Sequence, residues 1–363
     1  MKLRLDTSKT YAIALEGGGA KGAYEVGVWR ALDEADVRFD AVAGTSVGAL
    51  NGAMMVMGEL EQALRLWENI RFSQVFDADD EQLKKLYDHK LSEVDFRTLF
   101  KDAIEAIHEG GLDIEPLRRL IAEWVDEEKI RSSPKKLFLV TYSLTDKREL
   151  DMDADELEEG KLRDMLLASA YVPLFQRKKL DGKDYVDGSV HNIVPISSLL
   201  ERGYRDIIVI RIFGVGFEKR TRIPEDANII TVAPREKLGG VLQFDAAQSR
   251  RLLQLGYFDG LRMLYGLAGE KYYIDRQWSE TEAYFALQEL CRLFIKEETP
   301  SLWALNETIL PKLAKHLKVK DGGYYDLLTA LLERLAERQG ISPFRVRTEE
   351  MLLLEIAAKM KKK

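Results

Sequence analysis

The sequence predicts an α/β fold: a three-layer α/β/α arrangement with a mainly parallel central sheet, followed by a C-terminal helical extension. Three observations support this prediction. Residues 11–57 alternate strand-like apolar runs with helical periodicity, strand-like runs return between residues 137 and 232, and the periodicity is helical from residue 269 onward. Alternating strands and helices are typical of a parallel sheet, because parallel strands need a crossover connection that is usually a helix.

The opening segment predicts strand, loop, helix, strand, turn and helix, in this order. Residues 11–15 form a short apolar run that stops at three glycines, as a buried strand does. Apolar residues then recur at helical spacing after Gly22. Residues 39–44 predict a second strand, and a helix of small residues is expected from Val47.

The middle of the chain predicts a helical insertion and further strands. Residues 59–131 are rich in charged residues and have helical periodicity. The later strand signals are residues 137–142, residues 207–212, residues 229–232 and a hairpin at residues 179–186 that turns at Asp181-Gly182. We therefore expect two domains, residues 1–268 with the sheet and residues 269–363 as the helical extension.

Composition narrows the classes of partner and cofactor. The formal net charge of −7 gives no global basic field that would collect nucleic acid, so we expect no nucleic-acid partner. Cys291 is the single cysteine, which excludes an intramolecular disulfide and favours a reducing compartment. No spacing typical of zinc or calcium ligands occurs, and we expect neither a metal nor an organic cofactor.

Hydropathy predicts a protein without a membrane span. No run approaches the roughly 20 apolar residues that cross a bilayer. Residues 1–10 alternate charged with apolar residues, unlike a signal peptide, so we expect a cytoplasmic protein. The apolar and basic residues 351–363 suggest a peripheral contact with anionic membrane; alternatively, their lysines only favour the dipole of a helix end. The sequence leaves the oligomeric state open.

A G-x-S-x-G pattern lies between the second predicted strand and the helix after it, as Gly44-Thr45-Ser46-Val47-Gly48. A serine on such a sharp turn projects its hydroxyl beyond the sheet edge, and the residues two before and two after it must be small. The helix N-terminus adds free N–H groups near the reacting oxygen. Ser46 is thus a candidate nucleophile on an elbow formed by Gly44 and Gly48. The alternative is an ordinary serine at a helix N-cap.

A glycine-rich loop follows the first predicted strand, as Gly17-Gly18-Gly19-Ala20-Lys21-Gly22. Consecutive glycines let backbone N–H groups converge on an anion, which in an acyl hydrolase is the tetrahedral oxyanion. The loop also matches the G-x-G-x-x-G of a dinucleotide fold. That fold needs an acid at the end of the second strand, and here Asp40 is near its start. A turn needed only for packing remains the other alternative.

Later motifs complete an ordered set. Asp187-Gly188 follows the predicted hairpin, and alone such a pair usually marks a turn. The whole set resembles the patatin-like phospholipase family over about residues 9–266. Its members are the glycine-rich loop, the G-x-S-x-G pattern, Ala168-Ser169-x-x-x-Pro173, Asp187-Gly188, Asn192-x-x-Pro195, and Gly256-Tyr257 with Asp259.

The resemblance implies a three-layer α/β/α fold and a Ser–Asp dyad, in which Ser46 attacks an ester carbonyl and Asp187 removes its proton. It also implies an oxyanion hole made of three amides, those of Gly17, Gly18 and Gly19, with Lys21 and Gly22 supporting the loop. The chain departs from the usual family pattern at three positions, which concern substrate preference more than the dyad: Ser189 instead of glycine or alanine, Lys21 where arginine is frequent, and Phe175 one residue nearer to Pro173.

A Ser-Asp-His triad is the alternative to the dyad, because His191 follows Asp187 in the order of α/β-hydrolases. Four residues leave little chain to pass the carboxylate behind the imidazole ring. We therefore expect a lipid acyl hydrolase, a phospholipase A or lysophospholipase-like esterase that forms an acyl-enzyme. Its substrate would be a lipid or another acyl ester. The competing hypotheses are an acyltransferase on the same dyad and a non-catalytic nucleotide-binding protein.

Overall fold

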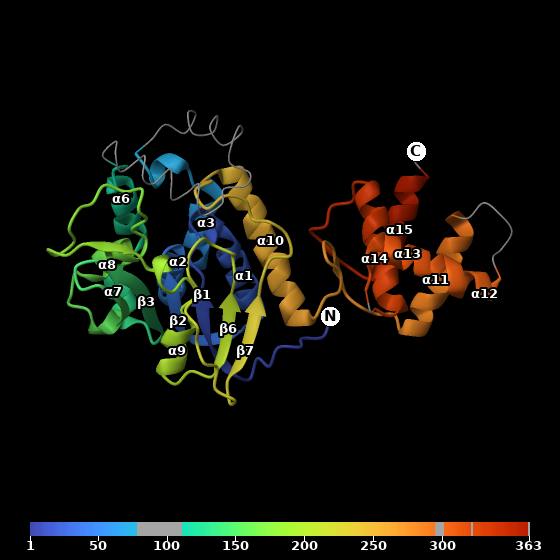
Figure 1. Cartoon of the computed structure of the whole chain (residues 1–363), viewed down its shortest axis with the longest axis horizontal. Helices are drawn as coiled ribbons and strands as arrows, with labels where there is room; N and C mark the ends of the chain where they lie inside the picture. Colours follow the sequence, from blue (N-terminus) through green and yellow to red (C-terminus); the bar gives the residue numbers. More distant parts are fainter. Residues whose placement is uncertain (78–110, 295–300, 321, 362–363) are drawn as a thin grey trace. The chain divides into compact units, whose positions relative to one another are not determined.

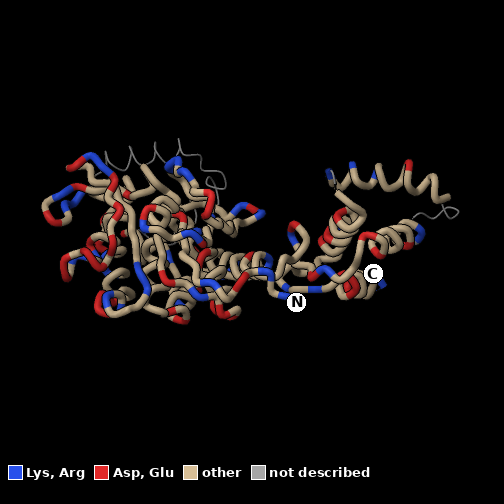
Figure 2. The backbone as a smooth tube through the Cα atoms, turned by 90° about the horizontal axis from the view of Figure 1, so that it is seen from below, with Lys and Arg blue, Asp and Glu red and all other residues tan. Residues whose placement is uncertain are grey.

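The computed structural model describes residues 1–77, 111–294, 301–320 and 322–361. The chain divides into two compact units, a larger one of Asp6–Gly260 and a smaller one of Met1–Leu5 with Leu261–Lys363 (Figure 1). Residues 78–110, in the middle of the predicted helical insertion, lie outside the described residues, as do His89 and His108. Basic and acidic residues are interspersed along the backbone of both units (Figure 2).

The larger unit is built on a seven-stranded sheet within the described residues, in the order β4-β3-β2-β1-β6-β7, with β5 paired to β3. Its strands are β1 (Thr10–Leu15), β2 (Arg38–Thr45), β3 (Lys136–Ser143), β4 (Arg148–Asp153), β5 (Tyr185–Asp187), β6 (Asp206–Ile210) and β7 (Asn228–Val232). The pairs β1–β2, β1–β6, β2–β3 and β6–β7 are parallel, whereas β4 and β5 run antiparallel to β3. The prediction of an α/β fold with a mainly parallel sheet is confirmed.

Helices cover both faces of this sheet, because successive side chains of a strand point to opposite faces. Ala12 and Ala43 belong to a buried cluster with Leu199 of α9 (Ile196–Glu201). On the other face, a Cβ at Gly52 of α2 (Val47–Met57) would lie 3.1 Å from the Val42 side chain. Val42 and Ala43 are neighbours on β2, so α9 and α2 lie on opposite sides of the sheet.

Further helices surround these layers in the larger unit: α1 (Ala23–Glu34), α3 (Leu60–Asn69), α6 (Glu115–Trp124), α7 (Glu127–Ser132), α8 (Leu162–Ser169) and the first part of α10 (Ala246–Tyr265). Two glycines let α1 and α10 approach closely. A Cβ at Gly27 would lie 2.1 Å from the Leu253 oxygen, and one at Gly256 would lie 2.0 Å from the Tyr24 oxygen. The Tyr24 hydroxyl also donates to Asp259 at 2.8 Å. This close packing of α1 and α10 gives a structural reason for Gly256 and Asp259 in the Gly256-Tyr257 motif.

One strand prediction for the larger unit was wrong, and one strand of this unit was missed. The expected hairpin at residues 179–186 is a tight turn closed by one antiparallel bridge, Leu180 to Lys183, and only β5 continues as a strand. The sequence analysis also missed β4, whose residues Arg148–Asp153 are mostly charged and only half-buried. Such an edge strand lacks the apolar run that identifies a buried strand.

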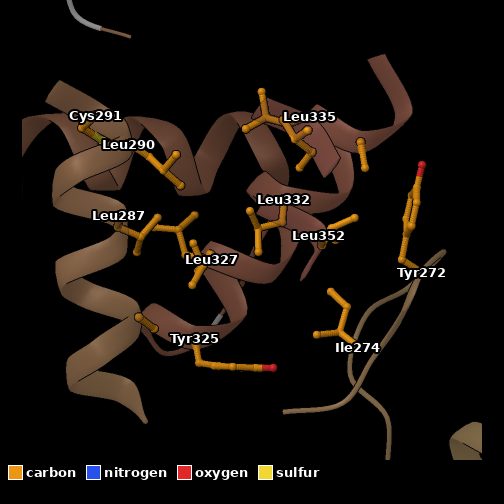
Figure 3. Close-up of a cluster of buried hydrophobic side chains, with 14 of the residues drawn as sticks. Tyr272, Ile274, Leu287, Leu290, Cys291, Tyr325, Leu327, Leu332, Leu335 and Leu352 are labelled. Atoms are coloured by element: carbon orange, nitrogen blue, oxygen red, sulfur yellow. The ribbon is translucent and has the colours of Figure 1, made fainter. Parts of the chain in front are cut away.

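The smaller unit is mainly helical, with α11 (Glu280–Phe294), α12 (Leu302–Ala304), α13 (Leu310–Leu317), α14 (Tyr324–Arg338) and α15 (Glu349–Met360). Leucines of α11, α14 and α15, including Leu287, Leu332 and Leu352, form its core (Figure 3). A short parallel pair, β8 (Tyr273–Ile274) with β9 (Val346–Arg347), was not predicted. Strands of two residues are too short to show an alternating pattern.

No helix among the described residues is both long enough and apolar enough to cross a membrane.

Candidate active site

Ser46 lies on the sharp turn between β2 and α2, as the G-x-S-x-G pattern predicts. Its backbone angles, φ 56° and ψ −125°, belong to a region that glycine adopts easily and other residues only under strain. A Cβ at Gly44 would lie 2.2 Å from the Gly48 oxygen, and one at Gly48 would lie 2.6 Å from the Leu15 oxygen. Both elbow glycines are therefore sterically required. The Ser46 side chain is almost buried, with 6% of its surface exposed.

Asp187 lies at the end of β5, where it pairs with Thr141 of β3. It is 4% exposed, and one carboxylate oxygen accepts the backbone N–H of Ser189 at 2.8 Å. Burial raises the pKa of the Asp187 carboxyl, while hydrogen bonds from Ser46 and Ser189 lower it in part. The structure thus brings Ser46 and Asp187 into contact, although a long stretch of chain separates them.

The glycine-rich loop runs beside this pair, and its three leading glycines have different surroundings. The N–H of Gly17 donates to the Ile193 oxygen at 2.9 Å, so the fold already uses this amide. Gly18 and Gly19 line a pocket together with Ser46 and Asp187. They stand at the start of the short 3-10 helix Gly19–Gly22, where the first N–H groups have no acceptor inside the helix.

Lys21 and Gly22 hold the loop in place. The buried ammonium group of Lys21 donates to the Phe213 oxygen, and burial lowers the pKa of this lysine, opposed by the charge of Glu16. A Cβ at Gly22 would lie 2.5 Å from the Val47 side chain. Both residues therefore act through packing and hydrogen bonding of the loop.

Glu16 is a supporting residue that the sequence analysis missed. It is 1% exposed and directly precedes the three glycines. Its carboxylate accepts the backbone N–H groups of Ile212 at 2.7 Å, Phe213 at 3.0 Å and Gly214 at 3.2 Å, and pairs with Arg211 at 2.9 Å. An acidic residue at the end of a buried strand was the only signal, because its partners lie almost 200 positions away in the chain.

His191 is not part of this arrangement. Its ring nitrogen Nδ1 contacts Glu149 at 2.5 Å, and the ring stacks on Tyr142 at 5.9 Å between centroids. The imidazole is nearly half exposed, and Asp187 and Ser46 are not its partners. The described geometry therefore favours a Ser–Asp pair over a triad through His191.

Two pockets meet at Ser46, and five residues line both: Gly19, Ser46, Val172, Val241 and Leu242. We call the one that contains Asp187 the outer pocket; its other lining residues include Gly18, Ser189, Val190, Val215 and Phe217. The inner pocket is apolar, and its lining residues include Leu50, Met54, Trp67, Leu117, Ile121 and Phe175. Among the described residues, no cluster of three His, Cys, Asp or Glu side chains could hold a metal ion.

Comparison with known proteins finds sequence similarity to patatin-like phospholipases and lysophospholipases. The family model described as Patatin-like phospholipase matches residues 13–200. Patatin-like phospholipase domain-containing protein 6 of Homo sapiens is 49% identical over 51 residues, which are 14% of this chain and 4% of that protein. Lysophospholipase nte1 of Aspergillus terreus is 48% identical over 46 residues, 13% of this chain and 3% of that protein. The matched segments thus span only a small part of these relatives.

Two solved structures are similar to the chain at low sequence identity. VipD from Legionella pneumophila has a TM-score of 0.43 and 14% identity, covering 97% of this chain and 87% of that chain. ExoU from Pseudomonas aeruginosa, in complex with SpcU, has a TM-score of 0.33 and 15% identity, covering 90% and 68%.

Proposed function

Because the chain belongs to the patatin-like phospholipase family, whose model matches residues 13–200, we propose that it hydrolyses carboxylic esters of lipids through an acyl-enzyme on Ser46. One observation carries this proposal. The side chains of Ser46 and Asp187 come from different parts of the sheet edge, interact with each other and line the same pocket as Gly18 and Gly19.

In the first half of the reaction, the hydroxyl oxygen of Ser46 attacks the ester carbonyl carbon while Asp187 takes the hydroxyl proton. The amides of Gly18 and Gly19 are our candidates for the donors that stabilise the resulting oxyanion. Removal of one such donor typically costs about 3 kcal/mol of transition-state stabilisation. Asp187 then gives its proton to the alcohol oxygen, the bond to the alcohol breaks, and the acyl group remains on Ser46.

In the second half, a water molecule replaces the alcohol. The water oxygen attacks the acyl carbon while Asp187 accepts a proton from the water. Asp187 then returns this proton to the Ser46 oxygen as the fatty acid leaves. A buried carboxylate suits this role because its raised pKa makes it a stronger base than an exposed aspartate.

A fluorophosphonate probe tests the proposal directly, since it reacts with activated serines. We expect the full chain to be labelled and to hydrolyse p-nitrophenyl and glycerolipid esters. Ser46→Ala should abolish both labelling and hydrolysis, and Asp187→Asn should abolish hydrolysis. Ser249→Ala is the matched control, because Ser249 is another buried serine of the larger unit. Circular dichroism shows whether each variant is folded.

Normal hydrolysis by folded Ser46→Ala or Asp187→Asn would refute the proposed mechanism. Product analysis in the presence of an added alcohol separates hydrolysis from acyl transfer, which would use the same acyl-enzyme. An unlabelled wild-type chain that binds a nucleotide tightly would instead favour a binding role for the glycine-rich loop.

A further inference from the structure

We infer that the two pockets at Ser46 divide the substrate: the inner pocket receives the acyl chain that is cleaved, and the outer pocket receives the alcohol that leaves. The inference rests on the proposed function, because it uses Ser46 as the nucleophile and Asp187 as the base. It goes further by naming the place of each half of the ester and the residues that limit the acyl chain.

The position of Asp187 assigns the outer pocket. In the tetrahedral intermediate, the carbonyl carbon carries four groups: the Ser46 oxygen, the oxyanion, the alcohol oxygen and the acyl chain. The base must reach the alcohol oxygen to protonate it as the bond breaks. Asp187 lines the outer pocket and not the inner one, so the alcohol lies on the outer side. The inner pocket, which also opens at Ser46, remains for the acyl chain.

The inner pocket follows one face of α2 away from the nucleophile. Val47, Leu50, Asn51 and Met54 line it, at positions i, i+3, i+4 and i+7 of the helix. Residues at this spacing share one face of a helix, and each turn advances about 5.4 Å along the axis. Leu50 therefore lies about one turn into the pocket, and Met54 about two turns.

Other lining residues of the inner pocket also suit an alkyl chain. Leu117 and Ile121 of α6 are among them, together with Phe76 and Phe175, whose rings stack at 5.2 Å between centroids. Transfer of one methylene from water to such surroundings should raise kcat/KM by roughly fourfold. The cavity volume is about 90 Å³, against about 330 Å³ for the outer pocket. By this volume the inner pocket is the smaller of the two.

The outer pocket offers more room and a mixed environment. Val190, Val215 and Phe217 give it apolar walls, while Asp187 and Ser189 lie near the reacting atoms. Phe217 and Val190 also reach the surface, with 61% and 39% of their area exposed. The two pockets together suit an ester whose acyl chain is apolar and whose alcohol portion is larger and extends toward solvent.

The test measures two substrate series separately. The first series contains p-nitrophenyl acetate, butyrate, octanoate, laurate and palmitate, which vary only the acyl chain. The second series contains butyrate esters of alcohols of increasing size, which vary only the leaving group. The variants are Leu50→Trp, Met54→Trp and Met54→Ala in the inner pocket, Phe217→Ala in the outer pocket, and Met55→Ala as the control.

We expect Met54→Trp to lower kcat/KM for palmitate at least tenfold while acetate and butyrate change less than twofold. Leu50→Trp should lower kcat/KM already for shorter acyl chains than Met54→Trp does, because Leu50 lies one turn nearer to Ser46. Met54→Ala should enlarge the pocket and favour longer chains, which keeps the test valid if a tryptophan variant does not fold. Phe217→Ala should change the relative kcat/KM values within the alcohol series and leave those within the acyl series unchanged. Met55 is a buried neighbour of Met54 that does not line the pocket, so Met55→Ala should leave both profiles unchanged.

The reverse pattern would overturn the inference. In that case Met54 variants would change the relative kcat/KM values of the alcohol series, or Phe217→Ala would change those of the acyl series. Unchanged acyl profiles in folded Met54 variants, with activity that still requires Ser46, would refute the pocket assignment alone. Absence of any Ser46-dependent ester hydrolysis in the wild-type chain would refute the proposed function, and the pocket assignment with it.

Discussion

The hydroxyl group of Ser169 accepts a hydrogen bond from the backbone N–H of Ser46 at 2.9 Å and donates one to the Val140 oxygen at 2.6 Å. Ser169 is the last residue of α8 and is fully buried. One hydroxyl thus connects the turn that carries Ser46 to both α8 and β3. This contact gives the Ala168-Ser169 motif a structural role in fixing the strained turn.

Ser169→Ala should therefore weaken the turn. The Ser46 N–H and the Val140 oxygen would each lose a hydrogen bond, and an unsatisfied buried group costs about 1–3 kcal/mol. We expect a loss of this order in the free energy of unfolding, measured with urea, and a lower kcat. Ser249→Ala removes from α10 a buried hydroxyl that has no hydrogen-bond partner among the described residues, so it should lower neither quantity. Equal stability and kcat of Ser169→Ala and wild type would contradict this role.

The rate of ester hydrolysis should fall at acid pH with a midpoint above the ordinary pKa of aspartate. Burial raises the pKa of Asp187, and in the proposed mechanism only its ionised form can accept the serine proton. Ser189→Ala removes a hydrogen bond that lowers this pKa, so the acid limb of kcat/KM should move to higher pH. The pH profile of kcat/KM checks both statements. Movement of the limb to lower pH in Ser189→Ala would contradict the assignment of the limb to Asp187.

Asp187 should also make the fold less stable as pH rises. Its pKa in the folded chain is above the value near 3.8 expected when unfolded, so between these values the folded state binds more protons. Stability then decreases with rising pH through this window. Asp187→Asn lacks this ionisation. Urea unfolding at several pH values should show its stability relative to wild type increasing from acid to neutral pH, and a constant difference would show that Asp187 does not titrate as described.

Glu16→Gln should disturb the glycine-rich loop without touching the proposed pair Ser46 and Asp187. Glutamine has one acceptor oxygen where the carboxylate has two, and it leaves Arg211 without its buried partner. The strand-to-loop segment at Gly214 lies against Gly17, since a Cβ at Gly214 would lie 1.8 Å from the Gly17 oxygen. We expect kcat to fall more than KM rises, by roughly 10²–10³ if one oxyanion donor is displaced.

Glu218→Gln is the matched control for Glu16, because Glu218 pairs with the same arginine at 3.0 Å but is half exposed. It should behave like wild type. Steady-state kinetics of both variants on one ester gives the comparison, and a wild-type kcat in folded Glu16→Gln would show that the loop keeps its shape without the carboxylate.

In the smaller unit, Leu332→Ala should destabilise the helical core. Leu332 is fully buried between α11 and α15 neighbours (Figure 3), and such truncations cost about 2–5 kcal/mol. Leu354→Ala on α15 removes a side chain that is 63% exposed and should change stability by less than about 0.5 kcal/mol. Thermal unfolding of the full chain measures both, and equal shifts for the two variants would contradict the packing described.

The sequence predicted those parts of the fold whose cause is local. The apolar run before Gly17 became β1, and the small residues around Ser46 became a strand–turn–helix, because sterics within a few residues decide both. The parts that depend on distant partners were not predictable in this way. The Gly17 amide donates to Ile193, and Glu16 accepts from the segment after β6, contacts that no spacing in the sequence reveals. The same holds for β4, which forms a strand because its backbone pairs with that of β3.

The backbone angles of Ser46 have an evolutionary consequence. Glycine would adopt them without strain, so Ser46→Gly relieves the strain of the turn, an effect that we expect a screen for heat resistance to favour at this position. A library of variants screened only for thermal tolerance should become enriched in it, whereas a screen for turnover should return serine. Selection for heat tolerance and selection for turnover should therefore favour different residues at this position.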